Sequence, residues 1–235
     1  MPLRGGSVCA LALAACVAWP AHAGQGSFSG GVALSTQLVD RGQAVSPATP
    51  ILQGSVAWAA NGWMLGLSGS ARFNAPAGHF VEATAQAARY WTLSSDWSMQ
   101  AGALYYRYPP HLKYPARQRY FDRMEVGVHW TWRDVLTFGV SSMSTVHQQR
   151  QHWREAVDAT FRWPLTRYLS LSVGAGVAHA LTPSYQRYSY GQAGLAWTQG
   201  AWRFEVVRLA SDQKPGWNPA YPKAEPWVAT LLWSF

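Results

Sequence analysis

The chain is poor in cysteine. Its two cysteines, Cys9 and Cys16, both lie within the first 23 residues, so the rest of the 235-residue sequence has none. That remainder therefore excludes disulfides, cysteine-ligated zinc and thiol catalysis.

Charged residues and long apolar runs are also scarce. Charged residues make up 13% of the chain, which is about half the share usual in soluble domains, and only three of them are lysines. A soluble surface rich in Lys and Glu is therefore disfavoured. After residue 23 no run approaches the roughly 20 apolar residues that a transmembrane helix needs, which excludes such a helix there.

Aromatic residues are abundant instead. The chain has 14 Trp and 11 Tyr, yet its mean hydropathy is only −0.13. A membrane protein with a low average hydropathy is typical of a barrel, because half of each strand faces a polar lumen.

The N-terminus predicts a secretory signal. Arg4 precedes an apolar run over 8–19, and the following segment ends with small residues at Ala23. We expect cleavage after Ala23, which leaves one mature domain over 24–235. The segment 13–16 also resembles a lipoprotein signal, so the alternative is a mature N-terminus at a lipidated Cys16.

Alternation of side chains predicts an all-β, transmembrane, up-and-down antiparallel β-barrel. Each alternating segment has roughly the nine to eleven residues with which a tilted strand crosses the hydrocarbon. There are twelve of them, an even number as in single-chain bacterial barrels. They lie near 28–36, 51–60, 63–71, 80–92, 97–107, 120–132, 135–144, 154–163, 168–180, 188–198, 202–210 and 226–235.

The connections alternate between short and long. Tight turns such as Asn61-Gly62 and Arg133-Asp134 suit the positive φ of two-residue hairpins. Between them lie longer segments, which we expect to face the cell exterior while the tight turns face the periplasm. The longer segments are 37–50, 72–79, 108–119, 145–153, 181–187 and 211–225.

The two faces of a strand differ in polarity. In the segment 120–132 one face carries Met124, Val126, Val128, Trp130 and Trp132, and the other carries Arg123, Glu125, Gly127, His129 and Thr131. The apolar face is expected to contact lipid. Tryptophans near the tight turns predict an interfacial girdle; they are Trp63, Trp91, Trp97, Trp130, Trp132, Trp163, Trp197 and Trp202.

The last ten residues alternate large apolar side chains and end in Phe235. Outer-membrane strands end this way, and the terminal aromatic is recognised by the barrel assembly machinery. We therefore predict that Trp233 and Phe235 form the assembly signal and that the protein is integral to the bacterial outer membrane.

The segment 34–46 contains Arg41-Gly42 and is followed by Pro50, Gln53-Gly54 and a hairpin around Gly62. This pattern resembles the N-terminal signature of the TorF-like family of proteobacterial outer-membrane porins. The chain departs from that signature at Val39-Asp40, where the family usually has an aromatic pair. The resemblance covers the first third of the chain and implies a channel-like barrel, with no known substrate and no catalytic residues.

Charged residues on the inward faces are the candidate pore lining. They could orient permeating solutes, with the excess of arginine favouring anions, or they could pair across the lumen and fill it; both readings stay open. The residues are Glu82, Arg123, Glu125, His129, Arg154, Asp158, Arg162, Arg203 and Glu205.

The formal charge of +8 reflects basic residues near the predicted outer rim. Their expected partners are lipopolysaccharide phosphates, for which arginine offers paired donors. Solvated loop charges are the alternative, and a secreted barrel has no nucleic-acid partner. The candidates around the third long loop are Arg107, Lys113, Arg117 and Arg119.

The sequence favours a porin-like channel for small solutes or ions, leaning toward anions, rather than an enzyme. A lipid-modifying enzyme is the first alternative. Its hypothetical catalytic triad would be His147, Ser144 and Asp158, which strand geometry does not support. The second is a structural or adhesive barrel that acts through its loops. His147 and His152 share a loop, but no metal and no cofactor are expected.

Overall fold

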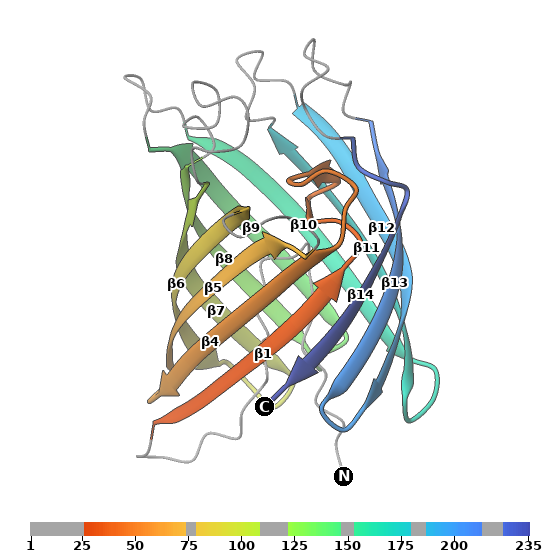
Figure 1. Ribbon diagram of the computed structural model, residues 1–235. Helices are drawn as coiled ribbons and strands as arrows, with labels where there is room; N and C mark the ends of the chain where they lie inside the picture. The colour runs from red at the N-terminus through yellow and green to blue at the C-terminus, as the bar shows by residue number, and fades with distance from the viewer. Residues whose placement is uncertain (1–25, 74–78, 109–121, 147–152, 180–186, 213–222) are drawn as a thin grey trace.

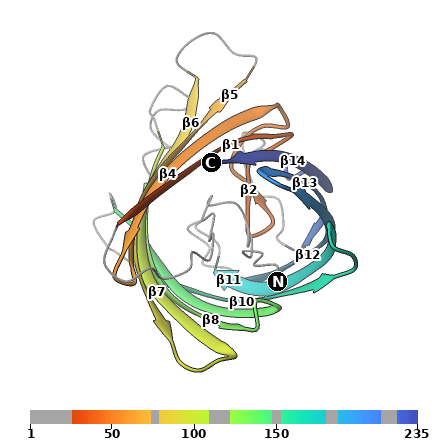
Figure 2. The same cartoon turned by 90° about the horizontal axis from the view of Figure 1, so that it is seen from below.

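The computed structural model describes residues 26–73, 79–108, 122–146, 153–179, 187–212 and 223–235. These residues form a closed barrel of twelve antiparallel strands, seen from the side in Figure 1 and along its axis in Figure 2. The wall strands are β1 (Ser27–Ser35), β4 (Ile51–Ala60), β5 (Trp63–Arg72), β6 (Phe80–Thr92), β7 (Trp97–Arg107), β8 (Arg123–Trp132), β9 (Leu136–Thr145), β10 (Arg154–Pro164), β11 (Leu169–His179), β12 (Arg187–Gln199), β13 (Trp202–Ser211) and β14 (Trp227–Ser234).

The predicted barrel is confirmed, and each wall strand begins and ends within three residues of its predicted bounds. Every wall strand pairs with its neighbour in the chain, and β1 also pairs with β14. Closure is completed by two backbone bonds, Gly30 N–H to Phe235 O at 2.9 Å and Phe235 N–H to Gly30 O at 3.0 Å. The described residues contain no helix long and apolar enough to cross a membrane.

Burial follows the two-residue period of the strands. On β10, Val157 and Phe161 are 43% and 40% exposed, whereas Asp158 and Arg162 between and beyond them are 8% and 6% exposed. Successive side chains of a strand point to opposite faces, so the apolar residues cover the outside and the polar residues face the lumen.

The tight turns have the backbone that their sequences predict. Asn61 and Gly62 have φ of 50° and 76°, and Arg133 and Asp134 have φ of 49° and 57°. Two successive residues with positive φ are the mark of a type I′ hairpin turn, whose twist matches that of the flanking strands.

The predicted aromatic girdle lies at the turn end of the barrel. Trp63, Trp163 and Trp202 are about half exposed, and Trp202 contacts Trp233, which in turn contacts Phe235 with ring centroids 5.0 Å apart. Large rings exposed outside a barrel suit the membrane interface, where an amphipathic ring has both apolar and polar surroundings.

The first long segment, 37–50, departs from the expectation. It was expected to face outward, but part of it forms a short hairpin of β2 (Val39–Asp40) and β3 (Gln43–Ala44) that lies inside the barrel wall (Figures 1 and 2). Its polar sequence resembles that of an outward loop, and only the contacts it finds in the lumen distinguish the two placements.

Candidate functional site

The inward hairpin is closed by the turn Arg41-Gly42. Their φ values of 47° and 73° again make a type I′ turn, and Val39 and Asp40 pair with Ala44 and Gln43. A Cβ on Gly42 would lie 3.0 Å from the Cβ of Tyr190 on β12, so this glycine also permits close approach to the wall.

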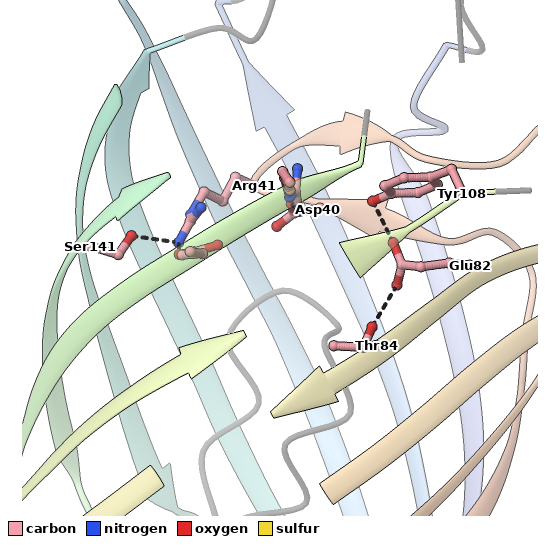
Figure 3. A network of polar contacts seen from close by, with 8 residues as sticks. Asp40, Arg41, Glu82, Thr84, Tyr108 and Ser141 are labelled. Carbon is pink, nitrogen blue, oxygen red and sulfur yellow. Dashed lines mark hydrogen bonds and ion pairs between the residues drawn. The ribbon is translucent and has the colours of Figure 1, made fainter. Parts of the chain in front are cut away.

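Two ion pairs join the tip of the hairpin to β8. Asp40 accepts from Arg123, and Arg41 donates to Glu125, so each hairpin charge meets the opposite charge on the strand. Arg41 Nη2 also donates to Ser141 Oγ on β9 at 3.0 Å (Figure 3). Hydrogen bonds between ionised partners are the stronger kind, so these contacts fix where the tip lies.

The hairpin therefore crosses the lumen. It follows β1 and precedes β4, which are neighbours in the wall, whereas β8 lies seven strands from β1 in one direction around the ring and five in the other. A segment attached at β1 and β4 and bonded to β8 connects opposite sides of the barrel.

Tyrosine and glutamate side chains extend this network along the wall. The guanidinium of Arg123 lies over the ring of Tyr106, 4.2 Å from its centroid. The Tyr108 hydroxyl donates to Glu82 Oε2 at 2.5 Å, and Thr84 Oγ1 lies 3.5 Å from the other carboxylate oxygen of Glu82 (Figure 3). The part of the hairpin that crosses the lumen, residues 39–44, which we call the crossing, thus lies among polar and aromatic side chains.

The base of the hairpin is held by apolar packing instead. Leu38, Ile51 and Val81 are almost completely buried against one another, and Val45 packs on them. Val81 faces inward because β6 has a bulge there: Ser70 pairs with Glu82 and Ala71 with Phe80, which leaves Val81 as the extra residue. One bulge therefore turns both Val81 and Glu82 toward the hairpin.

Gln37 ties the base to the segment before β14. Its side-chain amide donates to the carbonyls of Ser46 and Lys223, both at 2.9 Å, and its carbonyl accepts from Glu225 N–H at 2.8 Å. A buried amide with both ends bonded fixes the chain on either side of it.

The positive charge of Arg41 at the tip is insensitive to pH. Burial alone would lower the pKa of Arg41, but the carboxylates of Glu125 and Asp40 outweigh it and hold that pKa well above its ordinary value. For Tyr108, burial acts in the other direction and raises the pKa well above its ordinary value, so the phenol stays protonated and donates to Glu82.

The predicted pore residues do face inward, but the hairpin gathers only some of them. Glu82, Arg123 and Glu125 take part in its network, whereas Arg203 and Glu205 pair with each other on β13 at 3.0 Å. The remaining predicted residues lie at other positions of the inner wall: His129 on β8, and Arg154, Asp158 and Arg162 on β10.

Glycines between the charged strands make room for long side chains. A Cβ on Gly139 would lie 2.6 Å from the His129 ring and 3.1 Å from Asp158 Oδ1, so these two side chains converge over β9 from either side. Within the described residues no group of three or more His, Cys, Asp or Glu side chains is placed to hold a metal ion.

Sequence reasoning missed the lumenal partners of the wall charges. The sequence marks Arg41 as part of a family signature and Asp40 as a departure from it, but it assigns neither residue to the lumen. Asp40-Arg41-Gly42 does carry a turn signal, and the opposite signs of Asp40-Arg41 and Arg123-x-Glu125 are complementary. Neither signal indicates on which side of the wall the hairpin lies.

The predicted outer-rim cations are only partly described. Arg107 is exposed at the end of β7, and Lys113, Arg117 and Arg119 lie outside the described residues. The residues of the hypothetical catalytic triad do not come together. Asp158 is opposite Gly139 on β9, and Ser144 lies five residues further along that strand, which separates Asp158 and Ser144 by roughly 16 Å. His147 and His152 lie outside the described residues.

Comparison with known proteins gives the fold a reference. No protein-family model and no curated protein matches the chain. The NanC porin aligns with TM-score 0.58 and 9% identity over 89% of this chain and 99% of that one. The KdgM porin, solved in complex with disordered oligogalacturonate, aligns with TM-score 0.48 and 9% identity over 88% and 96%. At these identities the likeness to the NanC porin shows a shared fold alone.

Proposed function

We propose that the protein is an outer-membrane, porin-like channel for the passive passage of small solutes and ions. Its lipid-compatible exterior and polar interior support a place in the outer membrane, and the fold it shares with the NanC porin is consistent with that role. The resemblance of its first third to TorF-like porins points the same way. No reaction is part of the proposal.

The observation that carries the proposal is the inward hairpin. In a channel, a charged segment laid across the lumen sets the width and charge of the narrowest part. The ion pairs of Asp40 and Arg41 with β8 hold that segment in place.

The ionic selectivity we propose is a weak preference for anions. The predicted pore charges together with Asp40 and Arg41 comprise five carboxylates and five arginines, and those at the tip of the hairpin are paired. An anion preference then arises mainly from basic residues nearer the rim, such as Arg107 and the inward-facing Arg72 at the end of β5. The balanced charges are Asp40, Glu82, Glu125, Asp158 and Glu205 against Arg41, Arg123, Arg154, Arg162 and Arg203.

The proposal includes two partners at the membrane. Arg107, with Lys113, Arg117 and Arg119, is proposed to contact lipopolysaccharide phosphates, since guanidinium groups bind phosphate through paired donors. Trp233 and Phe235 at the end of the chain are proposed as the signal that the barrel assembly machinery recognises.

Reconstitution tests the channel. The folded protein in planar bilayers should give small, stepwise conductance in potassium chloride, with a reversal potential slightly on the anion side in a salt gradient. A folded barrel that passes no ions would favour the structural or adhesive alternative. Release of fatty acid from lipopolysaccharide or phospholipid by that same preparation would favour the enzyme.

A further inference from the structure

We propose that the hairpin crossing selects small zwitterionic solutes, which carry a carboxylate and an ammonium group, over neutral solutes of the same size. This inference rests on the channel function proposed above and concerns which solutes that channel favours. The juxtaposition behind it is the pair of crossed salt bridges, Asp40 with Arg123 and Arg41 with Glu125, set side by side in the lumen.

The crossed arrangement places both signs of charge on the hairpin and both on β8. The hairpin offers Asp40 next to Arg41, and β8 offers Arg123 two residues from Glu125 on the same face. A solute that touches the crossing therefore meets a cation and an anion together.

A solute of one sign fits this site poorly. An anion that engages Arg41 takes it from Glu125, which is 6% exposed and would be left charged without a partner. Stranding a buried charge costs more than the new contact returns. A zwitterion engages both members of the pair, so the exchange leaves neither of them stranded.

The two arginines of the crossing each keep a donor group that neither ion pair uses. Among the described residues, Arg41 Nη1 and Arg123 Nε are buried nitrogen atoms with no hydrogen-bond partner. They belong to the two arginines of the crossing, and a carboxylate is the acceptor that a guanidinium prefers. Because both nitrogens are covered, the carboxylate end of a zwitterion engages them as the arginine side chains shift, and its ammonium then pairs with Asp40 or Glu125.

Two isomers test the proposal. Alanine is a zwitterion and lactamide is neutral, and they have the same formula. Liposomes that contain the full mature protein should swell about fivefold faster in alanine than in lactamide, the factor expected from a single weak ion pair. Neither solute carries net charge, so no counter-ion limits the rate.

Variants assign the preference to the crossing. In Arg41→Gln/Glu125→Gln the alanine-to-lactamide ratio should fall to about one, and in Arg41→Glu/Glu125→Arg, which keeps both signs, it should persist. The second neutral pair, Asp40→Asn/Arg123→Gln, serves if the first does not fold. Arg133→Gln/Asp96→Asn removes an exposed pair at a turn outside the lumen and should keep the wild-type ratio.

The outcomes separate the two proposals. A wild-type ratio near one, or a ratio unchanged in both neutral pairs, overturns the zwitterion preference while the channel stands. Entry of neither solute overturns the channel and the preference with it. Folding of each variant is checked by its heat-dependent mobility on detergent gels.

Discussion

The base and the tip of the inward hairpin are held by different forces. The base packs Leu38 on Ile51 and Val81, with those side chains almost completely removed from solvent. The charged residues of the tip, Asp40 and Arg41, instead form two ion pairs, and Arg41 also donates to Ser141. Charges leave apolar packing unaffected, whereas an ion pair can exchange one partner for a charged group of a solute that reaches it. The difference teaches that one end anchors and the other can respond to what passes.

Removing the whole crossing should have the largest effect. Replacing residues 39–44 with a short Gly-Ser linker takes away both the tip and the strand pairs behind it, so the lumen should widen and single-channel conductance should rise several-fold. The measurement is conductance in planar bilayers at fixed salt. Unchanged conductance would mean that the narrowest part lies elsewhere in the barrel.

Loosening the base should lower stability. Leu38→Ala removes a buried side chain from the apolar cluster and should reduce the free energy of unfolding by about 2–5 kcal/mol. Urea unfolding in detergent micelles measures it. Leu67→Ala is the matched control because Leu67 is 63% exposed on the outer face, and it should lose less.

Breaking one tip pair should act on the hairpin more than on the barrel. Glu125→Gln leaves Arg41 facing a neutral amide, which weakens attachment of the tip by about 1–3 kcal/mol and should appear as more frequent open-channel flickering. The double variant Arg41→Gln/Glu125→Gln should flicker less than the single one, since no charge is stranded. Equal behaviour of the two would contradict the pairing.

An ion pair that is exposed to water should contribute least to stability. Asp96 and Arg133 form a two-bonded pair between tight turns, at 3.0 and 3.1 Å, with both side chains exposed. The hydrogen bond from Arg133 lowers the pKa of Asp96 below its ordinary 3.8. The small stability it adds is therefore present above about pH 4 and is lost as pH falls through the lowered pKa. Asp96→Asn should match the wild type in unfolding below that range and differ slightly above it.

The wall of the barrel was predictable because its signals are local. Alternation along β8 or β10 depends only on which residues fit lipid and which fit water, and Asn61-Gly62 specifies its own turn. The crossing was not predictable because it depends on partners far apart in the chain: Arg41 finds Glu125 across the lumen, 84 residues away. A polar segment between two strands has the same kind of sequence whether it folds inward or outward, and only the contacts it makes in the folded barrel separate the two cases.

The bulge on β6 has a consequence for how such a mouth can vary. Because Val81 is an additional residue in that strand, side chains above it are out of step with those below it. The alternation that places apolar side chains against lipid in the lower part of β6 is therefore independent of which side chains its upper part turns toward the hairpin. Insertion or deletion of one residue at the bulge would change which side chains face the lumen at the entrance. The apolar side chains that face lipid would keep their positions.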